Sequence, residues 1–144
     1  MLELPFLGVT SLEQEVELSL AVYEHPATQT EMARWNVTFL MPSPLPQYNI
    51  IGTGSPPTQL SDFKDMAVRA TGGVGTAVQA LGAELVSILS TEVKEALDKR
   101  QIEAVAFAPH AHMSFNTIDG ANWWTTNLNP GTVNCPVVVN TDAL

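Results

Sequence analysis

One arginine in this sequence stands where a cation could bind an anion. Arg69 ends the apolar residues 66–68 and is followed at once by the glycine-rich residues 72–75, which open an apolar helical pattern. A guanidinium can form paired hydrogen bonds with a carboxylate, and free N–H groups at a helix start favour the same charge. We therefore expect Arg69 to bind an anion. The alternative is a structural ion pair with a neighbouring Asp or Glu.

Two residues beside Arg69 extend this candidate site. Thr71 offers a hydroxyl donor, and Gly73 lies in the first turn of the predicted helix, where the helix dipole favours an anion. The same glycines could instead hold a phosphate, or only allow close packing. The phosphate hypothesis lacks the Lys-Ser/Thr pair of a P-loop and the acidic residue of a dinucleotide-binding motif. A carboxylate-facing helix start remains the preferred interpretation.

Other side chains that could do chemistry give weaker patterns. His110 and His112, with Asp119 nearby, have a spacing that suits a strand better than the helix predicted from Pro109, so we predict solvated or capping histidines and no metal. Cys135 has no motif of a catalytic nucleophile and is predicted to be a buried core residue. The sequence therefore predicts neither a catalytic residue nor a cofactor.

The composition limits the kind of protein this is. The chain has 144 residues, of which 45% are hydrophobic and 15% charged, as expected for one globular domain. Its net charge of −9 argues against nucleic acid and anionic membranes as partners. No apolar run is long enough to span a bilayer, and the N-terminus lacks the pattern of a signal peptide.

The hydrophobic periodicity and the positions of glycine, proline and helix-capping residues predict an α/β chain. A capping box from Thr10 to Glu13 precedes a predicted helix over 11–24. The order β-α-β-α-β over 66–107 predicts parallel strands joined by right-handed crossovers. Further helices are expected at 28–34, at 74–81, from a Ser90 or Thr91 cap to about 100, and after Pro109. Strands are expected at 35–41, 48–51, 66–71, 85–89, 103–107, 123–128 and 137–140.

Two adjacent tryptophans lie in one of the extended segments. Because neighbouring strand residues face opposite sides, one of Trp123 and Trp124 should enter the core while the other faces outward. We expect Trp124 to face the ligand, where its ring could stack on an apolar part of it.

The sequence resembles the solute receptors of tripartite ATP-independent periplasmic (TRAP) transporters in several segments, which occur in the same order and together cover nearly the whole chain. Residues 59–69, QLSDFKDMAVR, are similar to a segment of that family in which Asp-Leu-Lys-Gly is followed by a strand and then by an arginine. The other similar segments are LPF at 4–6, ALGA at 80–83, STEVKEAL at 90–97 and VVVN at 137–140.

This resemblance implies a periplasmic, two-lobed, type II-like binding protein fold with a mixed sheet and parallel βαβ units. It implies that the chain binds a small organic carboxylate through Arg69, with Phe107 lining the ligand, and works with the membrane permease subunits of the transporter. It also implies that 1–58 belongs to the first lobe and crossover, 59–121 to the ligand-binding core of the second lobe, and 122–144 to strands returning to the first lobe. The chain would then be the central part of a receptor of about twice its length.

The sequence departs from the family pattern at several positions. Asp65 replaces a usual glycine, Lys94 a usual tyrosine, and Arg100 the glycine that ends a helix. A second arginine that some relatives carry in the 52–54 segment is absent, so we expect a monocarboxylate with an apolar or hydroxylated remainder. Two alternatives stay open: an intracellular α/β domain or enzyme fragment that binds an anion or nucleotide, and a homo-oligomer formed through exposed sheet edges.

Overall fold

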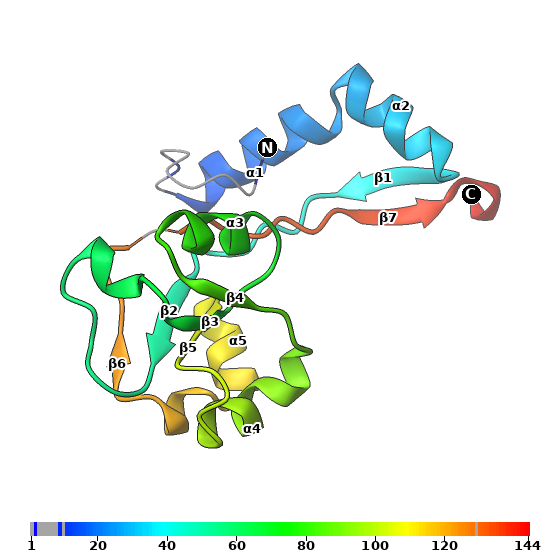
Figure 1. Cartoon of the computed structure of the whole chain (residues 1–144). Helices are drawn as coiled ribbons and strands as arrows, with labels where there is room; N and C mark the ends of the chain where they lie inside the picture. The colour runs from blue at the N-terminus through cyan, green and yellow to red at the C-terminus, as the bar shows by residue number, and fades with distance from the viewer. Residues whose placement is uncertain (1, 3–8, 10, 129) are drawn as a thin grey trace.

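The computed structural model describes residues 2, 9, 11–128 and 130–144 of the chain. The capping residue Thr10 and the LPF segment at 4–6 lie outside these described residues. Within them, the chain forms a compact lobe around a five-stranded sheet and an extended arm made of two helices and a two-stranded ribbon (Figure 1). No helix among the described residues is both long and apolar enough to cross a membrane.

The mixed sheet of the compact lobe confirms the predicted fold class. Its strand order is β4-β3-β5-β2-β6, in which β3 runs parallel to β4 and β5, while β2 runs antiparallel to β5 and β6. The strands are β2 (Asn49–Gly52), β3 (Ala67–Arg69), β4 (Glu84–Val86), β5 (Ala104–Phe107) and β6 (Trp123–Trp124). The parallel strands come from the predicted β-α-β-α-β segment. The predicted domain boundaries remain a prediction.

Helices cover both faces of this sheet. α3 (Gly72–Ala80) contributes Val74 and Val78 to an apolar cluster on one face, and α4 (Val93–Asp98) contributes Val93 and Leu97 to a second cluster. α5 (Pro109–Ser114) begins with its proline in the first turn, as predicted. Because β5 supplies residues to both clusters and all four of its residues are buried, it is the central strand of the core.

The helix that follows β4 begins differently from the prediction. Neither Ser90 nor Thr91 caps it, because Ser90–Glu92 forms a short 3-10 turn before the helix. Leu89 precedes this turn, and its N–H donates to Glu92 Oε2 at 3.2 Å. α4 then starts at Val93. The change matters for the site because it leaves the Ser90 hydroxyl free to accept a hydrogen bond from elsewhere.

The arm consists of α1 (Leu12–Tyr23), α2 (Pro26–Arg34), β1 (Val37–Met41) and β7 (Val137–Asn140). Ser11, rather than Thr10, caps α1 and accepts a hydrogen bond from the Gln14 N–H. β1 and β7 pair antiparallel, and Tyr23 stacks on Phe39 with ring centroids 5.0 Å apart. Figure 1 shows α1 and α2 on one side of this ribbon and no helix or strand on its other side.

Candidate functional site

Arg69 lies at the carboxyl end of β3 with its side chain on the α4 face of the sheet, beside Val105 and Val86 of the two neighbouring strands. Only 5% of the residue is exposed. Its Nε and Nη2 atoms both donate to the carbonyl oxygen of Ile88 at 3.3 Å, and Nη2 also donates to Ser90 Oγ at 3.3 Å. The guanidinium is therefore held by the loop that joins β4 to α4.

No acidic partner compensates this buried charge within the described part of the chain. The ion pairs there are Arg34–Glu31, Lys94–Asp98 and Lys99–Glu95, all on helix surfaces. The Nη1 atom of Arg69 has no hydrogen-bond partner among the described residues. Burial lowers the pKa of Arg69, and Tyr48 acts in the opposite direction. The structural ion pair considered from the sequence is therefore absent among the described residues.

Phe107 forms the apolar side of the site. The Arg69 Cζ atom lies 4.5 Å from the centroid of the Phe107 ring, which is a cation–π geometry. Phe107 is 4% exposed and stacks on Phe115, with ring centroids 5.4 Å apart. The two residues come from adjacent strands and share one face of the sheet, so the sheet itself fixes the pair.

His112 continues the row of rings and is a residue that sequence reasoning misjudged. It was predicted to be solvated or capping, but it is fully buried, with its ring 5.6 Å from that of Phe107. Its Nδ1 atom lies 2.9 Å from Thr117 Oγ1, and its Nε2 atom lies 3.3 Å from the Asn49 carbonyl oxygen. Burial lowers the pKa of His112, and the hydrogen bond to Asn49 opposes that shift.

The two tryptophans divide between core and surface, as predicted. Trp123 packs against the core, and its Nε1–H donates to the Thr53 carbonyl oxygen at 3.0 Å. Trp124 is 40% exposed, and its ring lies 5.3 Å from that of His112. It borders an open hollow of about 310 Å³ that is also lined by Ile51, Ile118 and Ala121. Arg69, Phe107, His112 and Trp124 therefore form one continuous row.

Thr71 and Gly73 lie at the start of α3, directly after β3. Thr71 is exposed and is the N-cap residue of α3, but its side chain makes no capping hydrogen bond. The hydrogen bonds of Arg69 go to the β4–α4 loop on the other face of the sheet and not to this helix start. The roles predicted for Thr71 and Gly73 as ligand donors therefore remain predictions.

The prediction for Cys135 has a clear outcome. Cys135 is exposed and is not a core residue, because it lies just before β7 of the arm and outside the five-stranded sheet. Within the described residues, no group of three or more His, Cys, Asp or Glu side chains is arranged to hold a metal ion.

Comparison with known proteins identifies the fold. Neither a family model nor a curated protein matches the chain. Among solved structures, the chain resembles an apo, open TRAP periplasmic solute-binding protein from Marinobacter aquaeolei, with 20% identity and a TM-score of 0.84 over 99% of this chain and 47% of that one. It also resembles DctP7 of Bordetella pertussis, an extracytoplasmic solute receptor binding pyroglutamic acid, with 19% identity and a TM-score of 0.79 over 99% and 46%.

A third similar structure is a TRAP periplasmic solute-binding protein from Sulfitobacter with bound β-D-galacturonate. It shares 14% identity and a TM-score of 0.81 over 99% of this chain and 47% of that one. The chain thus has the α/β fold of TRAP periplasmic solute-binding proteins. It spans about half the length of the structures it matches.

Proposed function

We propose that this chain is part of an extracytoplasmic solute receptor of the TRAP type and captures a small organic acid through Arg69. The fold supports this proposal, since the similar solved structures include a solute receptor binding pyroglutamic acid and TRAP periplasmic solute-binding proteins with bound galacturonate, L-malate or malonate. On this proposal the chain binds its ligand without chemical change, works at the periplasmic side of a membrane, and passes the ligand to permease subunits.

The observation that carries the proposal is the uncompensated burial of Arg69. Burying a charge is unfavourable unless an opposite charge or several hydrogen bonds replace its hydration. Arg69 has only the neutral oxygens of Ile88 and Ser90 as hydrogen-bond partners among the described residues. A ligand carboxylate would supply the missing negative charge and could accept the hydrogen bonds that Nη1 leaves unused.

The aromatic row gives this proposed site its second component. Phe107 lies against the guanidinium, so the part of the ligand next to the carboxylate would meet an apolar ring. Trp124 stands at the exposed end of the row, where it would contact a longer or cyclic ligand. The Thr71 hydroxyl would add a donor from the start of α3, and Gly73 would line the ligand beside it. We assign ligand contact to these five residues on this basis.

A thermal-shift screen of the chain against small carboxylates, nucleotides and inorganic phosphate would test the proposal. We expect a rise in melting temperature with one or more monocarboxylates, which bind only the folded state. The shift should vanish in Arg69→Ala and persist in Arg34→Ala, because Arg34 is exposed and paired with Glu31.

Other results would point elsewhere. A shift with nucleotides or phosphate and none with carboxylates would favour the alternative of an intracellular anion-binding domain centred on residues 72–75. A carboxylate shift that survives in Arg69→Ala would refute the role of Arg69 while leaving the receptor fold intact.

A further inference from the structure

Ser90 differs from the other group that accepts hydrogen bonds from Arg69, because it also carries a hydrogen that it can donate. Its Oγ atom accepts from Arg69 Nη2 at 3.3 Å, and no described residue accepts a hydrogen bond from its O–H group. A serine hydroxyl has one donor hydrogen and two acceptor lone pairs. The Ser90 hydroxyl is therefore only partly used, and it lies directly beside the guanidinium.

The hydrogen bonds of Arg69 show which donors of its guanidinium are unused. Nε and Nη2 share the Ile88 carbonyl oxygen, so they use the pair of parallel N–H bonds on one edge. The second Nη2 hydrogen then points along the end of the guanidinium, parallel to one Nη1 hydrogen, and it is the hydrogen available to Ser90. Among the described residues, the donors of Nη1 stay unused, and one of them lies next to the Ser90 oxygen.

The Ser90 oxygen occupies a place that a carboxylate oxygen takes in a paired contact with an arginine. A carboxylate bound to the end of a guanidinium puts one oxygen on each of two parallel N–H bonds. With Ser90 on the Nη2 hydrogen, a carboxylate would bind Nη1 of Arg69 through one oxygen. That oxygen would lie beside the Ser90 hydroxyl and could accept its hydrogen.

The described partners of Arg69 leave its charge available to a ligand. Its hydrogen bonds to Ile88 and Ser90 are all 3.3 Å long, whereas charge-assisted hydrogen bonds to carboxylates are about 2.7–2.9 Å long. Accepting a hydrogen bond from a cation polarises a hydroxyl and strengthens the bond that the hydroxyl donates. The O–H group of Ser90 is therefore a stronger donor beside Arg69 than an isolated serine would be.

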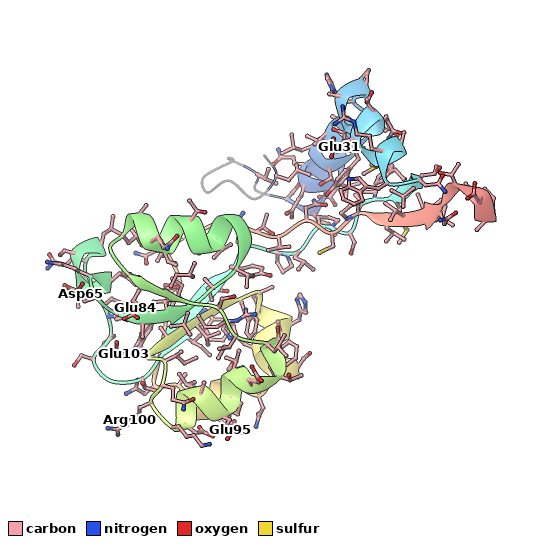
Figure 2. All side chains as sticks on the ribbon, turned by 45° about the vertical axis from the view of Figure 1, so that its right-hand side comes forward. Glu31, Asp65, Glu84, Glu95, Arg100 and Glu103 are labelled. Carbon is pink, nitrogen blue, oxygen red and sulfur yellow. The ribbon has the colours of Figure 1, made fainter. Side chains whose placement is uncertain are left out.

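No described acidic side chain forms an ion pair with Arg69. Glu92, in the turn that carries the hydroxyl, accepts a hydrogen bond from a backbone N–H group of its own loop. Asp65, Glu84 and Glu103 lie at the amino ends of the three parallel strands, whereas Arg69 lies at the carboxyl end of its strand. Figure 2 shows these three acidic side chains gathered on one side of the compact lobe. The sheet thus separates them from the arginine.

We propose that Ser90 is a ligand-binding residue of this site and donates its hydroxyl hydrogen to the carboxylate held by Arg69 Nη1. This inference rests on the proposed function, in which Arg69 captures a carboxylate. It gives the carboxylate one charged donor and one neutral donor, and Ile88 keeps the other edge of the guanidinium in place. Loss of the hydroxyl should therefore weaken carboxylate binding without moving the arginine.

Titration with sodium acetate, followed by NMR at the Arg69 side chain, tests the role of Ser90. Acetate carries the carboxylate with almost no remainder, and sodium chloride at equal ionic strength is the blank. Ser90→Ala should bind acetate at least about 10-fold more weakly than the wild type, as expected for a lost hydrogen bond to a charged group. Ser90→Thr, which keeps a hydroxyl, and Ser87→Ala, at an exposed serine of the same loop, should bind like the wild type.

Two further readings of the same spectra separate ligand contact from a structural role. Without acetate, the Arg69 Nε–H resonance of Ser90→Ala should match that of the wild type, because Ile88 still accepts its hydrogen bond. With acetate, the Ser90 hydroxyl proton of the wild type should become visible and move downfield. A displaced Nε–H resonance in unliganded Ser90→Ala, with no such hydroxyl signal in the wild type, would overturn the proposal by showing that Ser90 only positions Arg69.

The remaining outcomes distinguish this inference from the proposed function. Acetate binding that is equal or tighter in Ser90→Ala would overturn the role of Ser90 alone, because the hydroxyl would then merely compete with the ligand for Nη2. Arg69 resonances that respond to acetate no more than to chloride in the wild type would refute the carboxylate role of Arg69, and the role of Ser90 with it.

Discussion

The guanidinium of Arg69 lies over the ring of Phe107, with Cζ 4.5 Å from the ring centroid, and the two residues end adjacent parallel strands. Parallel strands connected by crossover helices bring their carboxyl ends to the same edge of a sheet, which is where open α/β sheets commonly bind ligands. The pair thus combines an uncompensated cation and an apolar surface in one place.

The account predicts that the charge of Arg69 does not stabilise the unliganded chain. A buried charge that lacks a counter-ion carries a desolvation cost that an apolar side chain of similar length does not carry. Arg69→Met should therefore be at least as stable as the wild type, by up to about 1 kcal/mol, in urea unfolding. Arg34→Met is the control and should change little. A loss of several kcal/mol in Arg69→Met would indicate a structural role.

The burial of His112 predicts a specific dependence of stability on pH. Because its pKa is lowered in the folded state from an ordinary value of 6.5, the unfolded chain binds a proton more readily. The free energy of unfolding should therefore fall as the pH drops below about 6.5. His112→Gln should remove this fall and His110→Gln should keep it, as measured by urea unfolding between about pH 7 and pH 5. Burial raises the pKa of Glu15, so this residue increases the free energy of unfolding as the pH falls. It does so in all three proteins and therefore does not affect the comparison. Equal slopes in the wild type and His112→Gln would contradict the prediction.

Gly52 is predicted to be essential for the close packing of the end of β2 against neighbouring residues. A Cβ atom at this position would lie 2.6 Å from the Glu103 carbonyl oxygen and would overlap the Trp123 ring. Gly52→Ala should therefore destabilise the chain by about 1–3 kcal/mol in thermal unfolding. Gly54→Ala is a useful comparison, because open space surrounds Gly54 and only its φ of 78° opposes a side chain. Its substitution should cost about 1 kcal/mol. The prediction fails if Gly52→Ala is neutral.

Arg100 should be a site of backbone strain that glycine relieves. It follows α4 with a φ of 55°, a conformation that side chains with a Cβ atom adopt at a cost. Arg100→Gly should raise the free energy of unfolding by about 0.5–1 kcal/mol, since the gain exceeds the added flexibility of the unfolded chain. Ala33→Gly, inside α2, should instead lower it by about 1 kcal/mol. Destabilisation by Arg100→Gly would show that its side chain makes a larger contribution than the strain.

Much of the fold could be predicted from the sequence, because in many segments the hydrophobic periodicity and the turn and capping residues indicate the same element. The βαβαβ segment and the proline start of α5 were both predicted correctly. Asp65 and Arg100, which replace glycines of the family pattern, do have positive φ values of 61° and 55°. These features depend on residues that are close in the sequence, so they can be predicted from the local sequence.

Features that depend on distant contacts were harder to predict. His112 looked like a surface residue, because only the fold brings it to the Asn49 carbonyl, 63 positions earlier in the chain. Ser90 was expected to cap a helix and instead accepts a hydrogen bond from Arg69. Cys135 was expected in the core, but the strand that follows it belongs to the open arm. Hydrophobicity alone does not distinguish an open ribbon from a buried strand.

The central claim is that Arg69 binds a carboxylate, and calorimetric titration tests it most directly. The carboxylate that gives the largest thermal shift should be titrated into the wild type, Arg69→Gln and Arg34→Gln. We predict that Arg69→Gln binds at least about 30-fold more weakly, since removing one member of a desolvated charge pair costs about 2–5 kcal/mol, and that Arg34→Gln binds like the wild type. Equal affinity in the wild type and Arg69→Gln would contradict the account.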